Sequence, residues 1–578
     1  MLHNIQIICP ALSTIAINMY RTPSRLIITG GGEIVSAEGT TQGDNLAMSL
    51  YALGTVPILN KLRRHTRVKQ VWLADDATST GRLEDLRSWW DDIVAEGRKY
   101  GYYVNSGKSW LIVKDPELLH EAEKAFRATN ISITTDGSRH LGAVLGSVTF
   151  RQQYINDLVQ EWTKQLNQLV EFAKSQPHAA YAAYTHGFKH KFTYFLRTIP
   201  EIVDLLYPID DILTEQFIPT LFGCPISELE RKIISLPVKF GGLGIQMLAD
   251  IAPFEFHAST TVTKPLVDEM HKQNREVPDD MDMTLKRLLD PILKSKEEAY
   301  KEKLALLETS CSIQQKRLLV QAQEKGAASW LNVLPLIEHG FVMNKSEFRD
   351  ALCIRYGKTI KNLPPKCACG KEYNITHAMN CHRGGFVILR HNEIRDFEAN
   401  LMKKVCTDVE IEPTLQKVSN EIVTGLNADG CHPDIRARGF WRKAQNAFFD
   451  VQISNINSDT YKNLAPEKVY ERLEREKRRR YNNRVMNIEH GTFTALIFTI
   501  SGGMGNESLT YHKALANKIA MKTGDKYCNV INFIRCKLSF LIQKLALLCL
   551  RGSRSLKQGS SEVPIDMDFA CFASKFCN

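Results

Sequence analysis

The chain has 578 residues, of which 44% are hydrophobic and 24% charged; this balance excludes a disordered chain and predicts several globular domains. Lysine and arginine exceed the acidic residues by a net charge of +10, which favours a polyanionic partner over an acidic substrate pocket without requiring one. The 14 cysteines are scattered apart from one cluster at 367–381, which excludes a disulfide framework and predicts a reducing, intracellular compartment.

Two apolar stretches have no membrane role in this interpretation. Residues 1–20 lack the basic start and the small-residue cleavage site of a signal peptide. The stretch at 538–550 is too short to span a bilayer and contains Lys544, so it predicts a buried helix.

Residues 1–150 are expected to mix short strands, glycine turns and one clear helix at 82–99, where apolar side chains recur at helical spacing. Residues 68–74 predict a strand that ends in a tight turn with two adjacent acids, Asp75 and Asp76. Neighbouring carboxylates repel each other and lose solvation unless a cation lies between them. The pair therefore indicates a divalent-metal site, and the alternative is a solvated acidic turn.

A glycine-containing loop precedes the acidic pair. In EGTTQGDNLAMSLYALG (38–54), Gly39 and Gly43 allow a ligand to approach the backbone closely, and Asp44 is placed to cap a helix that begins nearby. Such a loop suits a nucleotide or a base pair. Downstream, Lys108 follows a Gly/Asn/Ser turn and directly precedes a predicted strand.

In this order, the segments resemble the palm of the reverse transcriptases that non-LTR retrotransposons encode. The acidic pair matches the family's aromatic-Ala-Asp-Asp motif, with Leu73 in the place of the aromatic residue. Gln42 and Gly43 match the Gln-Gly core of the loop that packs against template and incoming nucleotide, and Lys108 matches the lysine beside the leaving pyrophosphate. The segment LPVKFGGLGI (236–245) is similar to one in the thumbs of these polymerases.

The resemblance implies an RNA-directed DNA polymerase in which Asp75 and Asp76 bind Mg²⁺ or Mn²⁺, with an RNA template, a DNA target and dNTPs as partners. Palms of this family also carry a third metal-binding aspartate on an earlier strand, and there is no aspartate between Met1 and Glu38. We therefore expect an N-terminally truncated palm, without fingers, whose unaided polymerisation is doubtful. The alternative is a longer polymerase whose start was misassigned.

A second constellation is CACGKEYNITHAMNCHRGG (367–385). It places Cys367, Cys369, His377 and Cys381 within fifteen residues, and three thiolates with one imidazole suit tetrahedral Zn²⁺. His382 is an alternative fourth ligand, and free thiols in a loop are the alternative to any metal site. Four protein ligands leave no open position, so the predicted role is structural.

A third constellation contains two further acids. Asp434 follows a proline in HPDIRARGFW (432–441), and Asp450 lies in the predicted strand NAFFDVQI, where side-chain alternation puts Asp450 and Gln452 on one face. The basic stretch at 474–491 predicts a helix that carries Lys477 and Tyr481 at i and i+4, hence on the same helix face.

These residues resemble the restriction-like nucleases, whose motif is Pro-Asp followed by acid-x-Lys, with Gln452 in the lysine position. The nucleases of site-specific non-LTR retrotransposons show a migrated Lys-x-x-x-Tyr on a helix and an upstream Arg/Lys-His-Asn/Asp motif, which RHN at 390–392 matches. The resemblance implies that Asp434 and Asp450 bind Mg²⁺, that Lys477 orients the attacking water or steadies the scissile phosphate, and that Tyr481 supports the site. The side chains expected to contact nucleic acid are those of Arg390, His391, Arg478, Arg479, Arg480 and Arg484, together with Gly39, Gln42 and Gly43 of the glycine loop.

Simpler interpretations exist for parts of this pattern. A charge run on a helix is usually a solvated face, the segment EKRRR could serve as a nuclear import patch, and Asp450 alone could be an edge-strand acid. GGMG (502–505) predicts a turn rather than a phosphate loop, because no Lys-Ser/Thr follows it.

The sequence therefore predicts a multidomain α+β protein. Its expected parts are a partial reverse-transcriptase palm (1–150), a helical thumb and linker (151–330, with a charged linker at 264–283), a neck with a CCHC zinc knuckle (331–385), an α/β restriction-like endonuclease (386–555) and a tail (556–578). The predicted function is that of a reverse-transcriptase fragment with a DNA-nicking endonuclease, as in target-primed retrotransposition; the alternative is an inactive nucleic-acid-binding relic. No membrane partner is expected, and the predicted location is intracellular with access to the nucleus.

Overall fold

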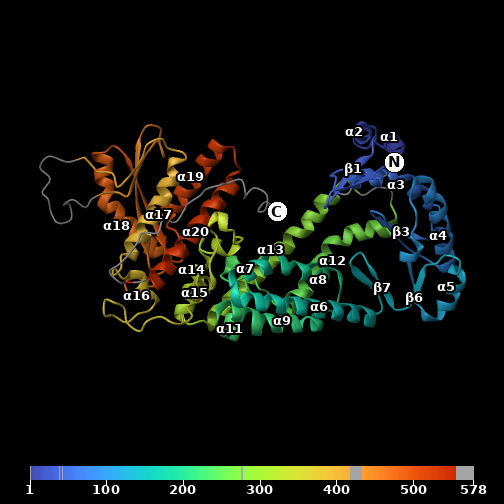
Figure 1. Cartoon of the computed structure of the whole chain (residues 1–578), viewed down its shortest axis with the longest axis horizontal. Coiled ribbons are helices and arrows are strands. Elements are labelled where there is room, and N and C mark those ends of the chain that lie inside the picture. The colour runs from blue at the N-terminus through green and yellow to red at the C-terminus, as the bar shows by residue number, and fades with distance from the viewer. Residues whose placement is uncertain are drawn as a thin grey trace. The chain divides into compact units, whose positions relative to one another are not determined.

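The computed structural model describes residues 2–37, 39–41, 43–274, 278–416, 432–552 and 554. Gln42 and the predicted tail at 556–578 lie outside the described residues. The chain is a helix-rich α+β protein that divides into two compact units, which confirms the general fold class (Figure 1). Unit 1 comprises Met1–Leu158, Phe195–Leu205 and Ala252–Leu293, and unit 2 comprises Val159–Tyr194, Leu206–Ile251 and Lys294–Asn578.

The N-terminal part of unit 1 is built from short helices and two-stranded sheets. Its elements are α1 (Leu2–Ile8), α2 (Pro10–Tyr20), α3 (Ala47–Leu62), α4 (Leu83–Gly97), α5 (Leu119–Phe126), the antiparallel pairs β1 (Ser24–Ile28) with β2 (Gly32–Ser36), β3 (Lys69–Leu73) with β4 (Asp76–Thr80) and β7 (Gly137–His140) with β8 (Ala143–Gly146), and the parallel pair β5 (Trp110–Ile112) with β6 (Ser132–Thr134).

A small core joins α3 and α4 to the strand that leads to the acidic pair. Ile58 and Leu62 of α3 pack with Trp89 and Ile93 of α4 and with Val68, next to β3. These are apolar positions at helical spacing, so the predicted helix at 82–99 is confirmed as α4 followed by a 3-10 turn. The strand predicted at 68–74 is confirmed as β3.

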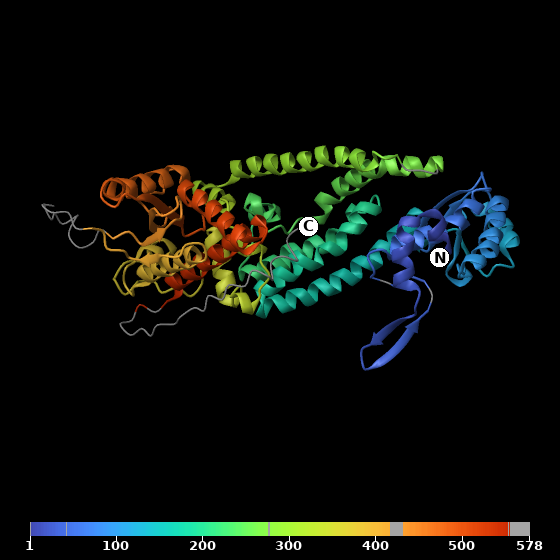
Figure 2. The same ribbon diagram turned by 90° about the horizontal axis from the view of Figure 1, so that it is seen from above.

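The β1–β2 hairpin stands away from the helices of its own unit (Figure 2). Arg25 and Glu33 form an exposed ion pair across it, and both strands are largely exposed. Glu33, the only acid described before Asp44, therefore lies on an exposed hairpin strand and not at a buried strand end.

Helices make up most of the described chain between 148 and 380, which confirms the mostly helical prediction for 151–330. They are α6 (Val148–Ser175), α7 (Pro177–Ala183), α8 (His190–Thr198), α9 (Tyr207–Ile212), α10 (Ile218–Phe222), α11 (Glu228–Ser235), α12 (Leu248–Lys272), α13 (Met281–Ser310), α14 (Ile313–Gln323), α15 (Lys345–Tyr356) and α16 (Ile375–Asn380). The linker predicted at 264–283 is wrong in extent, because α12 continues to Lys272 and α13 begins at Met281.

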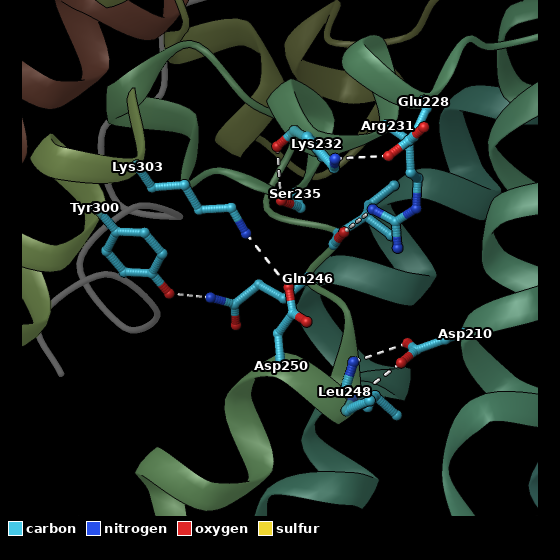
Figure 3. A network of polar contacts seen from close by, with 12 residues as sticks. Asp210, Glu228, Arg231, Lys232, Ser235, Gln246, Leu248, Asp250, Tyr300 and Lys303 are labelled. Carbon is cyan, nitrogen blue, oxygen red and sulfur yellow. Dashed lines mark hydrogen bonds and ion pairs between the residues drawn. The ribbon is translucent and has the colours of Figure 1, made fainter. Parts of the chain in front are cut away.

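The LPVKFGGLGI segment forms a tight connection between α11 and α12 in unit 2 (Figure 3). The buried Asp210 carboxylate accepts hydrogen bonds from the backbone N–H groups of Leu248 (2.7 Å) and Ala249 (2.9 Å), and so satisfies the start of α12. Arg231 donates to the carbonyl oxygen of Ile245 at 2.9 Å. A Cβ added at Gly242 would lie 1.9 Å from the carbonyl oxygen of Leu236, so only glycine fits there. These contacts give the segment a structural role.

The C-terminal part of unit 2 contains a four-stranded sheet of order β12-β11-β10-β9. Its strands are β9 (Val409–Ile411), β10 (Ile435–Arg438), β11 (Asn446–Ser454) and β12 (Thr492–Thr499), and its helices are α17 (Phe386–Lys403), α18 (Pro466–Asn487), α19 (Asn506–Thr523) and α20 (Tyr527–Arg551). β11 and β12 are parallel, whereas β10 pairs antiparallel with both of its neighbours. The apolar stretch at 538–550 lies in α20 and is largely buried, as predicted.

The two faces of this sheet are covered by different helices (Figure 1). Phe449 and Val451 pack with side chains of α17, α19 and α20, whereas Phe448 packs with those of α18. Asp450, the next residue on the Phe448 face, therefore points toward α18. The alternation predicted for this strand is confirmed, and it brings the acid to the basic helix.

Candidate functional site

The cysteine and histidine side chains at 367–381 converge. Cys367 and Cys369 lie on a turn that is closed by the hydrogen bond from Gly370 N–H to the Cys367 carbonyl oxygen (2.8 Å), and His377 lies on α16, just before Cys381. The four donor atoms lie within 4.8 Å of one another. The distances are 3.7 Å between the sulfurs of Cys367 and Cys381, and 3.3 Å from Cys369 Sγ to His377 Nε2.

This donor set fits zinc. Zinc–sulfur bonds of about 2.3 Å in a tetrahedron separate neighbouring donors by about 3.8 Å, close to the distances observed. The cluster could therefore hold a zinc ion with the predicted ligands. His382, the alternative ligand, is exposed and does not belong to the converging group.

The cysteine cluster packs into unit 2. Cys367, Tyr373 and Cys381 share a buried apolar cluster with Cys549 of α20. The Tyr373 hydroxyl donates to the carbonyl oxygen of Leu550 at 2.6 Å. A metal bound here would hold the turn, α16 and the end of α20 together.

Arg390 does not lie where a contact with nucleic acid is expected. Its side chain is 2% exposed, and its guanidinium lies against Met379 Sδ (4.0 Å) and Cys549 Sγ (3.9 Å). Burial lowers the pKa of this guanidinium. The position argues against the predicted nucleic-acid contact, because the residue faces the cysteine cluster and α20 instead of solvent.

Two acids meet where β10 begins beside β11. Asp434 directly precedes β10, and the antiparallel register places it across from Asp450. Asp434 accepts a hydrogen bond from the backbone N–H of Val451 at 2.5 Å, and its other carboxylate oxygen lies 3.0 Å from His391 Nε2. His391, predicted to contact nucleic acid, thus orients an acid of the site. No spacing pattern in the sequence signals this contact, because 43 positions separate the two residues.

The basic helix completes this group. Lys477 Nζ lies 2.5 Å from Asp450 Oδ2, and the lysine side chain is 20% exposed, whereas that of Asp450 is 4% exposed. Tyr481 is buried one helical turn later, and its hydroxyl donates to the carbonyl oxygen of His432 at 3.3 Å. Gln452 instead donates to the Ser454 hydroxyl. The ammonium beside Asp450 therefore comes from α18 and not from the strand position of Gln452.

The charge of Asp450 is strongly influenced by its surroundings. Burial is the main cause that raises the pKa of its carboxyl, and the nearby Asp434 carboxylate raises it further. The Lys477 ammonium and the Tyr481 hydroxyl lower this pKa, but burial prevails. A divalent cation bound between the two carboxylates would favour the ionised form of Asp450.

The donor chemistry of this pair fits Mg²⁺. Magnesium takes oxygen ligands and commonly uses one or two protein carboxylates, with water and phosphate oxygens in the other positions. Asp434 and Asp450 match this pattern, and Lys477 supplies a fixed positive charge beside them. Among the described residues, the Cys₃His set forms the group of three or more converging metal-type donors.

The arginines of α18 differ in their surroundings. Arg478 donates to Glu507 Oε1 at 2.6 Å, and Arg484 donates to the carbonyl oxygen of Gln416 at 2.6 Å. The Arg480 guanidinium lies 5.3 Å from the centre of the Tyr481 ring. Arg478, Arg479 and Arg480 are exposed, so this part of α18, which directly follows Lys477, presents basic side chains to solvent.

In unit 1, Asp75 and Asp76 lie at the exposed turn between β3 and β4, which Ala74 enters with a φ of 55°. The Tyr102 hydroxyl donates to the carbonyl oxygen of Asp75 at 2.9 Å. Burial is the main cause that raises the pKa of Tyr102 to about 12, and the charges of Tyr51, Asp75 and Asp76 raise it further. Within the described residues, no third acid, histidine or cysteine converges on the pair.

The other palm-type residues occupy turns, as predicted. Gly39 and Gly43 have positive φ values of 81° and 95°, and Asp44 accepts a hydrogen bond from the backbone N–H of Leu46 (2.9 Å) just before α3. Lys108 is exposed at the end of a 3-10 turn that precedes β5. The glycines and Lys108 lie in turns as predicted, whereas the N-cap residue of α3 is Leu46 and not Asp44. The role of these residues in binding nucleic acid stays a prediction.

No protein-family model and no curated protein matches this chain. Along the described ranges, each helix is too short or too polar to cross a lipid bilayer.

Proposed function

We propose that the C-terminal part of this chain is a Mg²⁺-dependent endonuclease that nicks DNA, within a retroelement-encoded protein of the reverse-transcriptase type. The observation that best supports this proposal is the meeting of Asp434, Asp450 and Lys477, which come from the start of β10, from β11 and from α18. Two buried carboxylates at the inner strands of the sheet can hold a divalent cation that promotes phosphodiester hydrolysis, and a nearby ammonium can stabilise the charge that develops.

Each residue has a distinct task in this proposal. Asp434 and Asp450 would hold the cation, which polarises a phosphate oxygen and lowers the pKa of bound water. Lys477 is exposed enough to reach the scissile phosphate, where it would stabilise the charge that develops during water attack. His391 and the N–H of Val451 keep the Asp434 carboxylate in place. Tyr481 fixes the helix face that carries the lysine.

The basic surface of α18 would bind the DNA backbone. Contacts to phosphates give affinity without sequence preference, and this affinity falls as salt rises. The Cys₃His cluster would hold zinc and stabilise the region beside the nuclease centre. A DNA target implies an intracellular protein with access to the nucleus.

The polymerase part of the proposal has a different basis. Asp75, Asp76 and Lys108, with the glycine loop, match a palm by motif and order, and they would act on an RNA template with dNTPs. In target-primed synthesis the nick supplies the 3′-hydroxyl that the polymerase extends. The geometry supports nicking best, because among the described candidate site residues it is Asp434, Asp450 and Lys477 that form a group of acids with a cationic side chain in contact.

A plasmid-nicking assay tests the nuclease. The full chain is incubated with supercoiled plasmid and Mg²⁺, and the appearance of open circles is measured. We expect Asp450→Ala to reduce nicking by about 10²-fold or more, as the loss of an essential metal ligand does. Gln452→Ala, on the same strand face, is the matched control and should nick like wild type. If wild type and Asp450→Ala nick equally little, the chain is an inactive nucleic-acid-binding relic.

A further inference from the structure

Helix α14 precedes the C-terminal sheet by many residues in the sequence, yet its polar side chains contact the segment that leads into α18. Arg317, Gln321 and Glu324 lie at i, i+4 and i+7, the first two on α14 and the third directly after it, and therefore face the same way. Their contacts lie between 136 and 147 positions later in the chain. We call these three residues the α14 anchor.

Arg317 binds the loop that starts α18. Its guanidinium donates to Asn457 Oδ1 (3.1 Å) and to the carbonyl oxygens of Ile456 (2.6 Å), Tyr461 (3.1 Å) and Leu464. Leu464 lies directly before the N-cap residue of α18. One guanidinium thus satisfies several carbonyl groups of an irregular loop, which fixes where the helix begins.

Gln321 also forms hydrogen bonds with the same loop. Its side chain is 1% exposed, and its amide exchanges two hydrogen bonds with the Asn457 amide, at 2.7 and 3.1 Å. Buried amides are costly unless they are paired, so this reciprocal pair specifies one docking position of α14 against the loop.

Glu324 connects α14 to both α18 and β12. The Tyr470 hydroxyl donates to Glu324 Oε1 at 2.9 Å and lies 3.4 Å from the Thr499 hydroxyl at the end of β12. A Cβ added at Gly503 would lie 1.9 Å from Glu324 Oε2, so this glycine leaves room for the carboxyl group. The GGMG turn therefore has a structural purpose, which is to receive Glu324 and Tyr470.

The held part of α18 is close to the nuclease centre. Lys477 follows Tyr470 by seven residues, which places both side chains on the same side of the helix, about 10 Å apart along its axis. A helix fixed at its first turns cannot swing, so the lysine ammonium stays at Asp450.

We propose that Arg317, Gln321 and Glu324 are positioning residues of the nuclease: they hold the start of α18 and thereby keep Lys477 at Asp450. This inference rests on the proposed nuclease function. It also means that the smallest working nuclease includes α14 and does not begin at α17.

The test uses the full chain with Arg317→Met and, as a matched control, Lys316→Met on the exposed side of the same helix. Hydrogen exchange of the α18 amides is measured together with plasmid nicking. We expect Arg317→Met to speed exchange across 466–487 by about tenfold or more and to lower kcat to a similar extent, with the KM for DNA unchanged. The control should change none of these quantities. A lower kcat at an unchanged KM indicates a positioning role, whereas a higher KM would indicate weaker DNA binding.

A second pair of variants guards against misfolding. Glu324→Gln keeps an acceptor for the Tyr470 hydroxyl and should retain both slow exchange and nicking, whereas Glu324→Leu should lose both. Unchanged α18 exchange in Arg317→Met and Glu324→Leu would overturn the inference, whether or not the chain cleaves DNA. If these variants exchange fast but wild type does not nick DNA, the proposed function is overturned. The conclusion that the α14 anchor fixes the start of α18 would still stand.

Discussion

The Glu324 carboxyl predicts a pH dependence of stability whose size can be worked out. Burial is the main cause that raises its pKa from the ordinary 4.5 to about 7; the Glu467 charge raises it further, whereas the Tyr470 hydrogen bond and the Arg317 charge lower it. At about 1.4 kcal/mol for each tenfold change in proton affinity, the gap corresponds to about 3 kcal/mol.

The sign of this effect follows from proton binding. Between about pH 4.5 and pH 7 the folded chain keeps a proton on Glu324 that the unfolded chain releases. The stabilisation is therefore fully present below pH 4.5, decreases as the pH rises through this window, and is gone above pH 7. Glu324→Gln cannot ionise and should remove this dependence.

Thermal unfolding of wild type and Glu324→Gln across pH 5 to 8 measures the effect. The two midpoints should be similar near pH 5, and the variant should unfold about 5 °C higher than wild type at pH 8. Asp450, whose pKa is also raised, is present in both chains, so its contribution cancels in the difference. A constant difference between the two midpoints over the whole pH range would refute the reasoning.

Three other substitutions test the cysteine cluster, the α11–α12 connection and the basic helix. Cys381→Ser should abolish stoichiometric zinc in metal analysis, because one of four donors is lost. Gly242→Ala should lower the free energy of unfolding by about 2–4 kcal/mol in urea titrations, because the new methyl group meets the Leu236 carbonyl. Arg479→Ala should weaken DNA binding and reduce the slope of log affinity against log salt by about one, whereas Arg390→Met should leave this slope unchanged.

Each of these substitutions has a control. His382→Ala should retain zinc, and a zinc-free His382→Ala chain would contradict the ligand set. Gly187→Ala, where an added Cβ meets nothing within 4 Å, should be close to neutral, so equal losses at both glycines would contradict the packing argument. A smaller salt slope for Arg390→Met than for Arg479→Ala would contradict the burial of Arg390.

Features that depend on neighbouring residues could be predicted from the sequence. The helix α4 follows from apolar side chains at helical spacing, and the facing of Asp450 follows from strand alternation. The zinc-type ligands lie within a short segment, so a turn and one helical turn are enough to gather them. In these cases the periodicity of a helix or a strand fixes the direction of each side chain, whatever packs against it.

Features that depend on distant packing could not be predicted. Arg390 and His391 are adjacent on α17, but successive helical residues point about 100° apart, so one meets the cysteine cluster and the other meets Asp434. Only the tertiary fold decides what covers each face. The same holds for Glu324, whose partner Tyr470 is 146 positions away. The charge of residues 264–283 predicts a linker, but α12 continues to Lys272. It does so although Pro265 lies within it and proline often ends a helix.

The parallel pairing of β11 and β12 affects how such a centre can be recognised. Strands that run parallel need a crossover, and α18 is that crossover. Its path passes over Asp450, so an amine on the returning helix reaches the carboxylate that a lysine two positions along the strand would otherwise serve. The proposed reaction requires an ammonium group beside Asp450, and a residue on either the strand or the helix can supply it. A sequence search for the motif acid-x-lysine would miss this site, because Gln452 occupies the lysine position. A structural search for two carboxylates beside an ammonium would find it.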